Sequence, residues 1–402
     1  MKNILLLTNI YPMNDPAYDG TPVCHFFTRE WVKMGYNVKV VHFMSLFPEP
    51  YYWVGRLFGE QIAAKTGCVT YSHPSRKCEK YLVDEVPVMY VPITKFVPHH
   101  NFSRKRIEKA FQWVCRQLEQ ENFVPDVVTA HFPLPQLEML YLFKQKYASA
   151  RTCLVLHGDG SQIPEIYPDT YQEYMNAVDV WGFRSLAFKN QFNEIFGEKK
   201  NEFLCYSGIP DAYFSDENRK FESPVRNFVF VGSLFKLKNV DVTIKALRQA
   251  FPEGNFHLDI VGSGAENENL RHLVETLDLT KNVVFWGQQK RDEAQKVMAA
   301  ADCFVMVSTR EAFGLVYVEA MAKGCVTVAT RGQGIDGVIV DGENGFLCEA
   351  ENVDALAAVL RQIGQLPIEK LNDIAAKSVH TARQLTNTKV AESYINAIIQ
   401  SL

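Results

Sequence analysis

The sequence lacks several features that mark common classes of protein. Its 402 residues contain no apolar run near the ~20 residues that span a bilayer, and its formal net charge of -4 argues against wholesale binding to nucleic acid. None of the nine cysteines forms a C-x-x-C pair, and most lie in apolar runs such as "TCLVL". They are therefore expected to be reduced, buried thiols in a cytosolic protein rather than metal ligands.

Two motifs for cofactors and metal ions are also missing. Where a dinucleotide-binding domain carries G-x-G-x-x-G after its first strand, this chain has only Gly20 and Thr21, which argues against NAD or FAD. No D-x-D motif follows a strand, so neither a metal ion nor another cofactor is expected. The loop at Gly20 and Thr21 could still bring backbone amides to an anionic ligand, or it could be an ordinary turn.

Short apolar runs alternate with amphipathic segments along the chain, a pattern typical of parallel sheets with helices on both faces. We expect strands at 2–8, 37–43, 86–91, 125–130, 152–158, 202–208, 227–233, 256–264, 282–287, 302–308, 325–330 and 337–340. We expect helices at 23–35, 103–121, 135–148, 240–250, 266–278, 290–300, 314–323, 353–363, 369–381 and 387–401. The sequence therefore predicts the α/β class, with two tandem doubly wound, Rossmann-like domains facing each other across a cleft.

A polar stretch at 207–226, rich in Ser, Pro, Asp and Glu, divides the chain. It is expected to link an amino-terminal domain of residues 1–206 to a carboxyl-terminal domain of residues 227–386. A last helix at about 387–402 could pack back on the first domain. Because ligands of doubly wound domains bind at the carboxyl ends of the strands, residues that follow strands are the candidates for function.

Two histidines stand at the ends of consecutive strands in the first half. His157 leaves a buried strand in "LHGDG", flanked by Gly158 and Gly160. A neutral imidazole there could exchange a hydrogen bond with a sugar hydroxyl or steady a developing charge. His131, in "TAHFPLP", is expected to lie beside it, either as a structural residue or as a contact of the acceptor.

Two glycine-containing loops open the second half. "VGSLFKLKNVD" places Lys236 and Lys238 between a strand and a helix, where a lysine can neutralise a leaving diphosphate. "IVGSGAENENL" repeats the strand, Gly-x-Gly, helix pattern at Gly262, which permits close approach of backbone to a ligand. Taken alone, each loop could also be an ordinary solvated connection.

The stretch "STREAFGLVYVEAMAKG" at 308–324 contains a predicted helix start. The helix is expected to begin near Gly314 and to stop at the last glycine of the stretch. Its first backbone amides, near Phe313, Gly314 and Leu315, have no acceptor within the helix and lie at the positive end of its dipole. A diphosphate could bind there.

Two carboxylates flank this helix start, Glu311 in the turn and Glu319 inside the helix. Eight residues of helical rise span ~12 Å, about the distance from a sugar, past two phosphates, to a ribose. Glu311 could hold sugar hydroxyls and Glu319 ribose hydroxyls, so the pair is typical of a site for a nucleotide sugar. Each glutamate taken singly could also be an ordinary residue of a helix.

In these segments the sequence resembles the retaining glycosyltransferases of family 4, which have the GT-B fold. The resemblance covers almost the whole chain, and its most specific part is the family's motif of Glu, seven residues and Glu. Further matches are the Gly-Thr loop, "HG", "VGSLFKLKNVD", "VVFWG" and "GQGIDGVIVDGENGFL". The implied roles are Glu311 on the donor sugar, Glu319 on the ribose, Lys238 on the diphosphate and His157 beside the transferred sugar.

The resemblance also implies further donor contacts and shows two departures. The implied contacts are Gly20, Thr21, Ser233, Gly262, Gly287, Gln288, Phe313, Gly314 and Leu315. Ser233 stands where the family often has arginine, so Lys238 would carry more of the charge, with Lys236. The aspartate of the family's "HG-x-D" comes one place early, so no role passes to Asp159.

The function implied is that of a metal-independent, retaining hexosyltransferase. It would move a sugar from a UDP- or GDP-sugar to a saccharide or lipid-linked acceptor, in the synthesis of bacterial surface polysaccharide or glycolipid. Two alternatives stay open: a catalytically inactive partner subunit that binds nucleotide sugars, which Ser233 and Asp159 favour, and a sugar-nucleotide epimerase on the same fold. The pair of glutamates argues against the epimerase.

Three segments of the first half, 43–60, 72–80 and 101–109, are aromatic or basic. They could form an apolar, basic lip for a lipid-linked acceptor at a membrane surface, or a folded insertion with a solvated basic face. The expected location is the cytoplasm, with peripheral contact at the inner face of the membrane in the first case.

Overall fold

The computed structural model describes residues 2–13, 22–50, 52–53, 75–96, 101–214 and 219–400. Contacts divide the chain into two compact units. The first unit takes the chain up to Arg184, then Phe188–Cys205, and the chain from Val390 onward; the second takes Ser185–Ala187 and Tyr206–Lys389. The chain therefore passes from the first unit to the second near residue 205 and returns near residue 390.

The first unit is built, in its described part, on an eight-stranded sheet in the order β3-β4-β2-β1-β5-β6-β7-β8. The strands are β1 (Asn3–Thr8), β2 (Asn37–Leu46), β3 (Glu79–Val83), β4 (Val86–Thr94), β5 (Val127–His131), β6 (Arg151–Leu156), β7 (Val180–Phe183) and β8 (Glu202–Leu204). Neighbouring strands pair in parallel, except that β3 runs antiparallel to β4. The continuous apolar run of β1 is fully buried because both faces of the central strands are covered.

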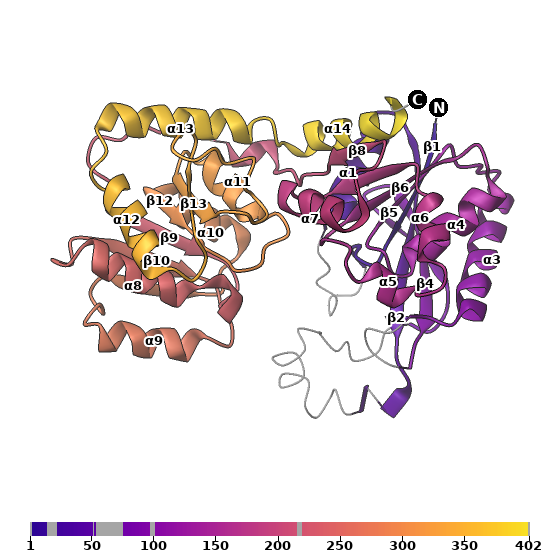
Figure 1. Cartoon of the computed structure of the whole chain (residues 1–402), viewed down its shortest axis with the longest axis horizontal. Helices are drawn as coiled ribbons and strands as arrows, with labels where there is room; N and C mark the ends of the chain where they lie inside the picture. Colours follow the sequence, from indigo (N-terminus) through magenta and orange to yellow (C-terminus); the bar gives the residue numbers. More distant parts are fainter. Residues whose placement is uncertain are drawn as a thin grey trace. The chain divides into compact units, whose positions relative to one another are not determined.

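Helices pack against this sheet, with α3 and α4 side by side (Figure 1). They are α1 (Val23–Lys33), α3 (Arg104–Gln120), α4 (Gln136–Lys146), α5 (Ile163–Ile166), α6 (Tyr171–Asn176) and α7 (Leu186–Phe196). In α3 the buried residues Ile107, Ala110, Val114 and Leu118 recur every three or four positions, which places them on one face. The other faces of α3 are free to carry charged and aromatic side chains.

The last helix, α14 (Asn387–Gln400), adds the end of the chain to the first unit. The indole nitrogen of Trp31 donates to the carbonyl of Ala391 at 2.8 Å, and the ring of Tyr394 meets Trp31 edge to face. Tyr394 and Ile398 are at most 1% exposed. The helix is therefore part of the core of this unit.

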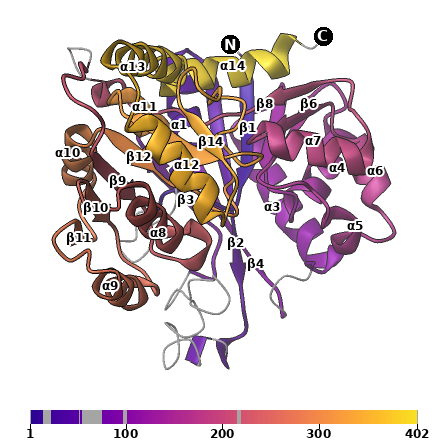
Figure 2. The same cartoon turned by 60° about the vertical axis from the view of Figure 1, so that its left-hand side comes forward.

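The second unit is built, in its described part, on a six-stranded parallel sheet in the order β11-β10-β9-β12-β13-β14. Its strands are β9 (Asn227–Val231), β10 (His257–Val261), β11 (Val283–Gly287), β12 (Cys303–Val305), β13 (Val326–Thr330) and β14 (Phe346–Cys348). Its helices are η1 (Asp211–Tyr213), η2 (Lys236–Lys238), α8 (Val240–Ala250), α9 (Asn267–Thr276), α10 (Arg291–Ala300), α11 (Leu315–Ala322), α12 (Val353–Ile363) and α13 (Ile368–Ala382). Helices α8 and α12 lie side by side (Figure 2).

The order of this second sheet reverses at β9, which lies between β10 and β12. In a doubly wound fold such a reversal opens a crevice at the carboxyl ends of the two central strands, and ligands bind there. A ligand site is therefore expected at the loops that follow β9 and β12.

The predicted fold of two doubly wound, Rossmann-like α/β arrangements is confirmed. The strand predicted at 337–340 is wrong: those described residues form no strand, and the strand that follows β13 is β14. The side chain of Asn344 accepts from the amide of Val340 at 2.7 Å and donates to the carbonyl of Val338 at 3.0 Å, which closes a turn instead. The strands β3, β7 and β14 and the helices α5, α6 and α7 were not predicted.

Candidate functional site

Two loops at the switch point of the second unit bring a lysine and a glutamate into contact. Lys238 ends η2 after β9, and Glu311 lies in the turn after β12. The Nζ atom of Lys238 is 2.5 Å from Oε2 of Glu311, and the two side chains are 23% and 15% exposed. The pair is accessible from solvent, so an anionic ligand could compete with Glu311 for the lysine.

A buried asparagine fixes the distance between these two loops. Asn239 adopts a left-handed conformation with φ of 51°, and its amide donates to the carbonyl of Val307 and to the hydroxyl of Thr309, both at 2.8 Å. The amide of Thr309 in turn donates to the carbonyl of Leu237 at 2.9 Å. Sequence reasoning missed Asn239. The available signal was an asparagine directly before a helix, a residue type that tolerates positive φ.

The turn before α11 has a shape that only glycine fits. Gly314 has φ of 80°, and a Cβ atom there would lie 2.3 Å from the ring of Tyr317. A Cβ atom on Gly334 would lie 2.7 Å from the Cα of Phe313, so a second loop packs directly on this turn. Phe313, Gly314 and Leu315 therefore lie together at a helix start, where the first backbone amides have no acceptor within the helix and suit an anion.

The second glutamate, Glu319, is buried on α11 and already has partners. Arg291 donates to its Oε1 at 2.7 Å and Gln295 donates to its Oε2 at 2.8 Å. Burial raises the pKa of Glu319, although Arg291 and Gln295 act in the opposite direction. Each carboxylate oxygen keeps a further lone pair, so a ligand hydroxyl can bind without breaking either contact. Arg291 and Gln295 come from α10, and sequence reasoning did not anticipate them.

The glycine loops of the second unit pack backbone against backbone. A Cβ atom on Gly262 would lie 1.8 Å from the carbonyl oxygen of Gly232, and the amide of Gly262 donates to the carbonyl of Gly287 at 2.9 Å. Ser233 and Gln288 are exposed beside these glycines. The structure thus brings Ser233, Gly262, Gly287 and Gln288 to one group of loops at the carboxyl ends of β9, β10 and β11.

In the first unit, the two predicted histidines are in direct contact. His131 ends β5 and His157 follows β6, and Nδ1 of the first lies 2.9 Å from Nε2 of the second. The ring of Phe132 stacks on His157 at a centroid distance of 3.9 Å. Burial, and then the nearby cation of Arg184, hold the pKa of both imidazoles well below the usual range. Both rings are therefore neutral near pH 7.

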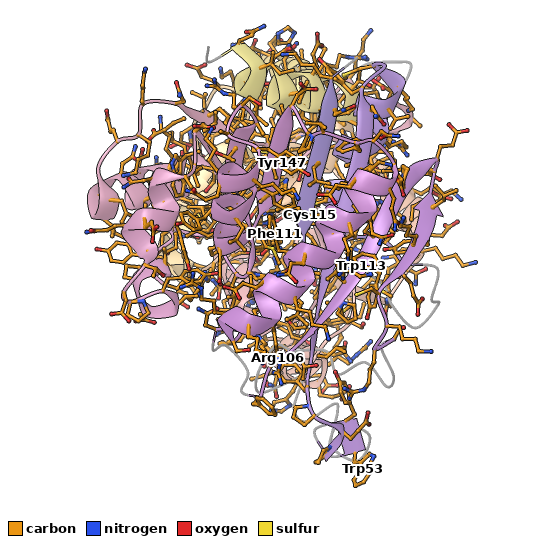
Figure 3. The ribbon with its side chains drawn as sticks, turned by 90° about the vertical axis from the view of Figure 1, so that its right-hand side faces the viewer. Trp53, Arg106, Phe111, Trp113, Cys115 and Tyr147 are labelled. Atoms are coloured by element: carbon orange, nitrogen blue, oxygen red, sulfur yellow. The ribbon has the colours of Figure 1, made fainter. Side chains whose placement is uncertain are left out.

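A basic groove lies between α3 and the carboxyl end of β4 in the first unit. Its cavity volume is about 280 Å³, and its lining includes Arg76, Arg106, Lys109, Trp113 and Arg116. The last four recur on one face of α3 at helical spacing, and Arg106 and Trp113 are seen there in Figure 3. Part of two predicted segments lies outside the described residues, namely 51, 54–60 and 72–74.

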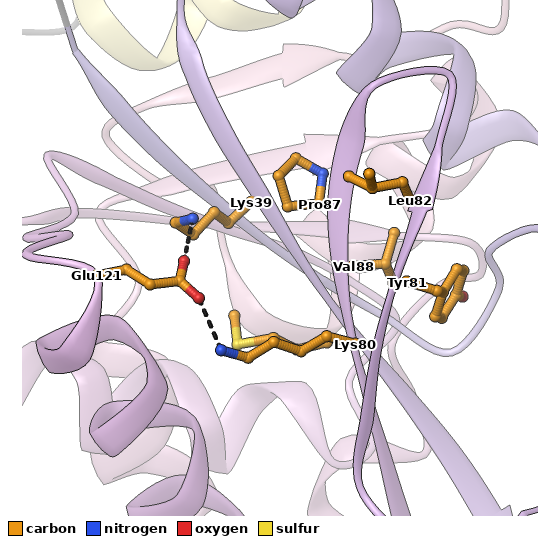
Figure 4. A pocket seen from close by; sticks show the side chains of 8 residues that line it. Lys39, Lys80, Tyr81, Leu82, Pro87, Val88 and Glu121 are labelled. Atoms are coloured by element: carbon orange, nitrogen blue, oxygen red, sulfur yellow. Dashed lines mark hydrogen bonds and ion pairs between the residues drawn. The ribbon is translucent and has the colours of Figure 1, made fainter.

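A second cavity of about 450 Å³ lies near the amino ends of β2 and β4. Figure 4 shows Lys39 and Lys80 both reaching Glu121, the second at 2.7 Å. Much of the charge of this cavity is compensated within the protein. It also lies at the end of the strands opposite to the one where doubly wound folds bind ligands.

The remaining residues considered from the sequence are Gly20, Thr21 and Asp159. Gly20 and Thr21 lie outside the described residues. Asp159 accepts from the amide of Ser161 at 3.0 Å and from its hydroxyl at 2.8 Å, which stabilises a local turn. Within the described ranges, no group of three or more His, Cys, Asp or Glu is placed to hold a metal ion, and no helix is both long and apolar enough to cross a membrane.

Several known proteins are similar to this chain over much of its length. Residues 214–379 match the family described as glycosyl transferases group 1. The chain is 26% identical over 291 residues to N-acetyl-alpha-D-glucosaminyl L-malate synthase of Bacillus anthracis, covering 69% of this chain and 74% of that protein. It is 23% identical over 299 residues to the putative colanic acid biosynthesis glycosyltransferase WcaL of Salmonella typhimurium, covering 72% and 73%.

Solved structures show the same fold over the whole chain. Anabaena Alr3699/HepE in complex with UDP has a TM-score of 0.67 and 19% identity, covering 100% of both chains. The lipopolysaccharide outer core galactosyltransferase WaaB has a TM-score of 0.69 and 16% identity, also covering 100% of both. The fold is therefore GT-B, and the chain has homologues among the group 1 glycosyltransferases.

Proposed function

We propose that this protein is a retaining, metal-independent hexosyltransferase that uses a UDP- or GDP-sugar. The observation that carries the proposal is the contact between Lys238 and Glu311 at the start of α11, inside the segment that matches the group 1 family. A solvent-accessible lysine, helix amides and a carboxylate at one strand end together suit a diphosphate joined to a sugar. The complexes of HepE with UDP and with UDP-glucose are consistent with this donor class.

In this proposal, donor binding changes the partner of Lys238. The diphosphate takes the ammonium group and the amides at Gly314 and Leu315, which frees Glu311 to hold sugar hydroxyls. Glu319 holds the ribose hydroxyls while Arg291 fixes its carboxylate. The remaining donor contacts are proposed for Gly20, Thr21, Ser233, Gly262, Gly287, Gln288 and Phe313. His157 of the first unit is assigned to the transferred sugar, and His131 supports it.

The proposed reaction exchanges one bond at the anomeric carbon of the sugar. The bond from that carbon to the diphosphate oxygen breaks, and a bond to the acceptor oxygen forms on the same face. The acceptor proton passes to an oxygen of the leaving diphosphate. Lys238 and the amides of α11 stabilise the charge that develops on the diphosphate, which is the task a metal ion performs elsewhere.

A donor screen tests this proposal. Thermal shift and sugar release would be measured with UDP-, GDP- and ADP-sugars, with and without EDTA. We expect one nucleotide to raise the melting temperature, insensitive to EDTA, and Glu311→Gln to lower turnover roughly 100-fold because it loses a charged contact to the sugar. The control Glu343→Gln changes an exposed glutamate and should behave as the native protein.

The screen also separates the alternative functions. Binding without turnover would favour an inactive partner subunit, and conversion of the nucleotide sugar without an acceptor would favour an epimerase. If no nucleotide sugar binds, the proposed function is wrong.

For the acceptor side, we propose a lipid-linked substrate and peripheral contact with an anionic membrane on its cytoplasmic face. The basic groove is the supporting observation, because Arg106, Lys109 and Arg116 present three cations along α3. Two aromatic side chains, Trp53 at 61% and Phe96 at 70%, are exposed in the same unit, and the ring of Phe96 stacks on Arg106. Cations together with exposed aromatic rings suit the interface of an anionic bilayer.

Liposome flotation tests the membrane contact. We expect the protein to float with vesicles containing anionic lipid and not with zwitterionic vesicles, and the double variant Lys109→Glu, Arg116→Glu to abolish flotation. The matched control Lys281→Glu, Lys290→Glu changes two exposed lysines of the second unit and should leave flotation intact. Absence of flotation with anionic vesicles would contradict the membrane proposal and leave the donor proposal standing.

A further inference from the structure

Four side chains of the first unit form a continuous hydrogen-bonded chain that ends at His157. Thr129 Oγ1 lies 2.6 Å from the hydroxyl of Tyr394, and that hydroxyl lies 3.2 Å from Nε2 of His131. His131 Nδ1 then lies 2.9 Å from Nε2 of His157. Tyr394 on α14 is thus linked through His131 to His157, the histidine that we assign to the transferred sugar.

The four hydrogen-bonded side chains are enclosed by aromatic rings. Thr129, His131 and Tyr394 are at most 1% exposed. The ring of Phe27 stacks on His131 and meets Tyr394 edge to face, at centroid distances of 6.0 and 5.0 Å. Buried polar atoms in such a setting must satisfy one another, because water does not reach them. Each member of the chain therefore constrains where its neighbour carries a proton.

The chemistry of the links favours one arrangement of these protons. A neutral imidazole carries a single N–H, and the site of that proton is set by the partner of the other nitrogen. A phenol is a better donor than a neutral imidazole, and an imidazole nitrogen is a better acceptor than a phenol oxygen. Tyr394 therefore donates to Nε2 of His131, and His131 donates from Nδ1 to Nε2 of His157. His157 is left with its proton on Nδ1.

We propose that Tyr394 and His131 are positioning residues that hold His157 as the Nδ1–H tautomer, so that it offers a hydrogen-bond donor to an oxygen of the transferred sugar. Among the described residues, Nδ1 of His157 has no protein partner, so it can meet a ligand. The role on the sugar rests on the proposed function, whereas the tautomer does not. The carboxyl-terminal helix is then a part of the site as well as of the core.

Nitrogen NMR of the histidine rings tests the tautomer directly. In protein labelled with ¹⁵N histidine, with the His157 signals assigned by their loss in His157→Gln, we expect the proton on Nδ1. Tyr394→Phe removes only the hydroxyl and should shift His157 to a mixture of tautomers. Thr129→Val should give a smaller change in the same direction. A proton on Nε2 in the native protein, or an unchanged His157 spectrum in Tyr394→Phe, would overturn the proposal.

A control separates positioning from loosening of the helix. Trp31→Phe removes the hydrogen bond from Trp31 to the carbonyl of Ala391 and keeps an aromatic ring against Tyr394, so it weakens the attachment of α14 while leaving the four hydrogen-bonded side chains in place. It should lower the melting temperature and leave the His157 spectrum as in the native protein. If Trp31→Phe changes that spectrum as much as Tyr394→Phe does, the effect comes from packing and the proposal is overturned.

Kinetics test the link to the sugar. Loss of one buried hydrogen bond should lower kcat for sugar release in Tyr394→Phe by about tenfold, with little change in KM for the donor. Native turnover in a variant whose tautomer has changed would overturn the role on the sugar. If the native protein itself turns over no nucleotide sugar, the proposed function fails, while the ring spectra still decide the tautomer.

Discussion

Glycine at position 314 meets two separate constraints, one on the backbone and one on space. Its φ of 80° is unfavourable for other residues, and a Cβ atom would lie 2.3 Å from the ring of Tyr317, which is buried. We expect Gly314→Ala to lower the free energy of unfolding by roughly 2–4 kcal/mol, measured by urea unfolding, because both penalties apply.

Gly332 provides the matched control for this prediction. It has a φ of 70°, and the space that a Cβ atom would occupy there is open, so Gly332→Ala adds backbone strain alone. It should cost about 1 kcal/mol. If Gly314→Ala and Gly332→Ala lower the free energy of unfolding equally, the ring of Tyr317 moves away from the added Cβ atom without cost.

Glu138, in the first turn of α4, should make stability depend on pH. It is 4% exposed, and burial raises its pKa from 4.5 to about 7. Since the folded carboxyl binds its proton more tightly than the unfolded one, the free energy of unfolding should fall as pH rises from about 4.5 to 7. Above that range Glu138 is ionised in both the folded and the unfolded protein, and the folded protein bears the full free-energy cost of the buried carboxylate.

The substitution Glu138→Gln removes this titration. We expect it to stabilise the protein at pH 8 by up to ~3 kcal/mol and to flatten the decline between pH 5 and 8 in urea unfolding. The control Glu165→Gln changes an exposed glutamate of α5 and should leave the decline unchanged. The same decline in Glu138→Gln as in the native protein would contradict the assignment.

At the scale of residues, the sequence predicts contacts that follow from strand order and misses those made by distant helices. The contact of His131 with His157 was predictable, because both end consecutive strands that prove to be neighbours. The partners of Glu319 were not predictable, since Arg291 lies on another helix and a sequence does not state which helices pack together. Tyr394 is the extreme case, because it is more than 200 residues from His131 in the chain.

Among the elements, α14 should contribute strongly to the stability of the first unit. Ile398 is fully buried in that unit, so Ile398→Ala leaves a cavity and should lower the free energy of unfolding by about 2–4 kcal/mol in urea. Glu392→Ala changes an exposed position of the same helix and should cost under ~0.5 kcal/mol. A loss no larger in Ile398→Ala than in Glu392→Ala would show that the helix is only loosely attached.

Strongly patterned elements were predictable, whereas β3, β7, β14, α5, α6 and α7 were not predicted. The helices at 240–250 and 353–363 were placed to the residue, because their apolar positions recur with helical period. The strand β7 has four residues and contains a glycine, so it gives little signal. The error at 337–340 has a different origin: the run is apolar because Val338 and Ile339 are buried in a turn, and burial alone does not distinguish a turn from a strand.

For the whole molecule, the division into units predicts how the chain can be cut. The segment 206–389 contains nearly all of the second unit and its own sheet. Expressed alone, it should unfold cooperatively by circular dichroism and, under the proposed function, show a thermal shift with the nucleoside diphosphate that the intact protein binds. The segment 1–205 lacks α14 and should be much less stable. If adding a peptide of residues 390–402 does not raise the stability of the segment 1–205, the assignment of α14 to the core of the first unit is contradicted.

The return of the chain into the first unit also sets an order of events on the ribosome. Translation of 206–389 separates the bulk of the first unit from α14 by roughly 10–40 s, at ~5–20 residues per second. Throughout that interval Trp31 and Thr129 lack the partners that α14 brings them. The second unit is almost contiguous and can finish first, so the nascent protein should complete its halves in the reverse of their order in the gene.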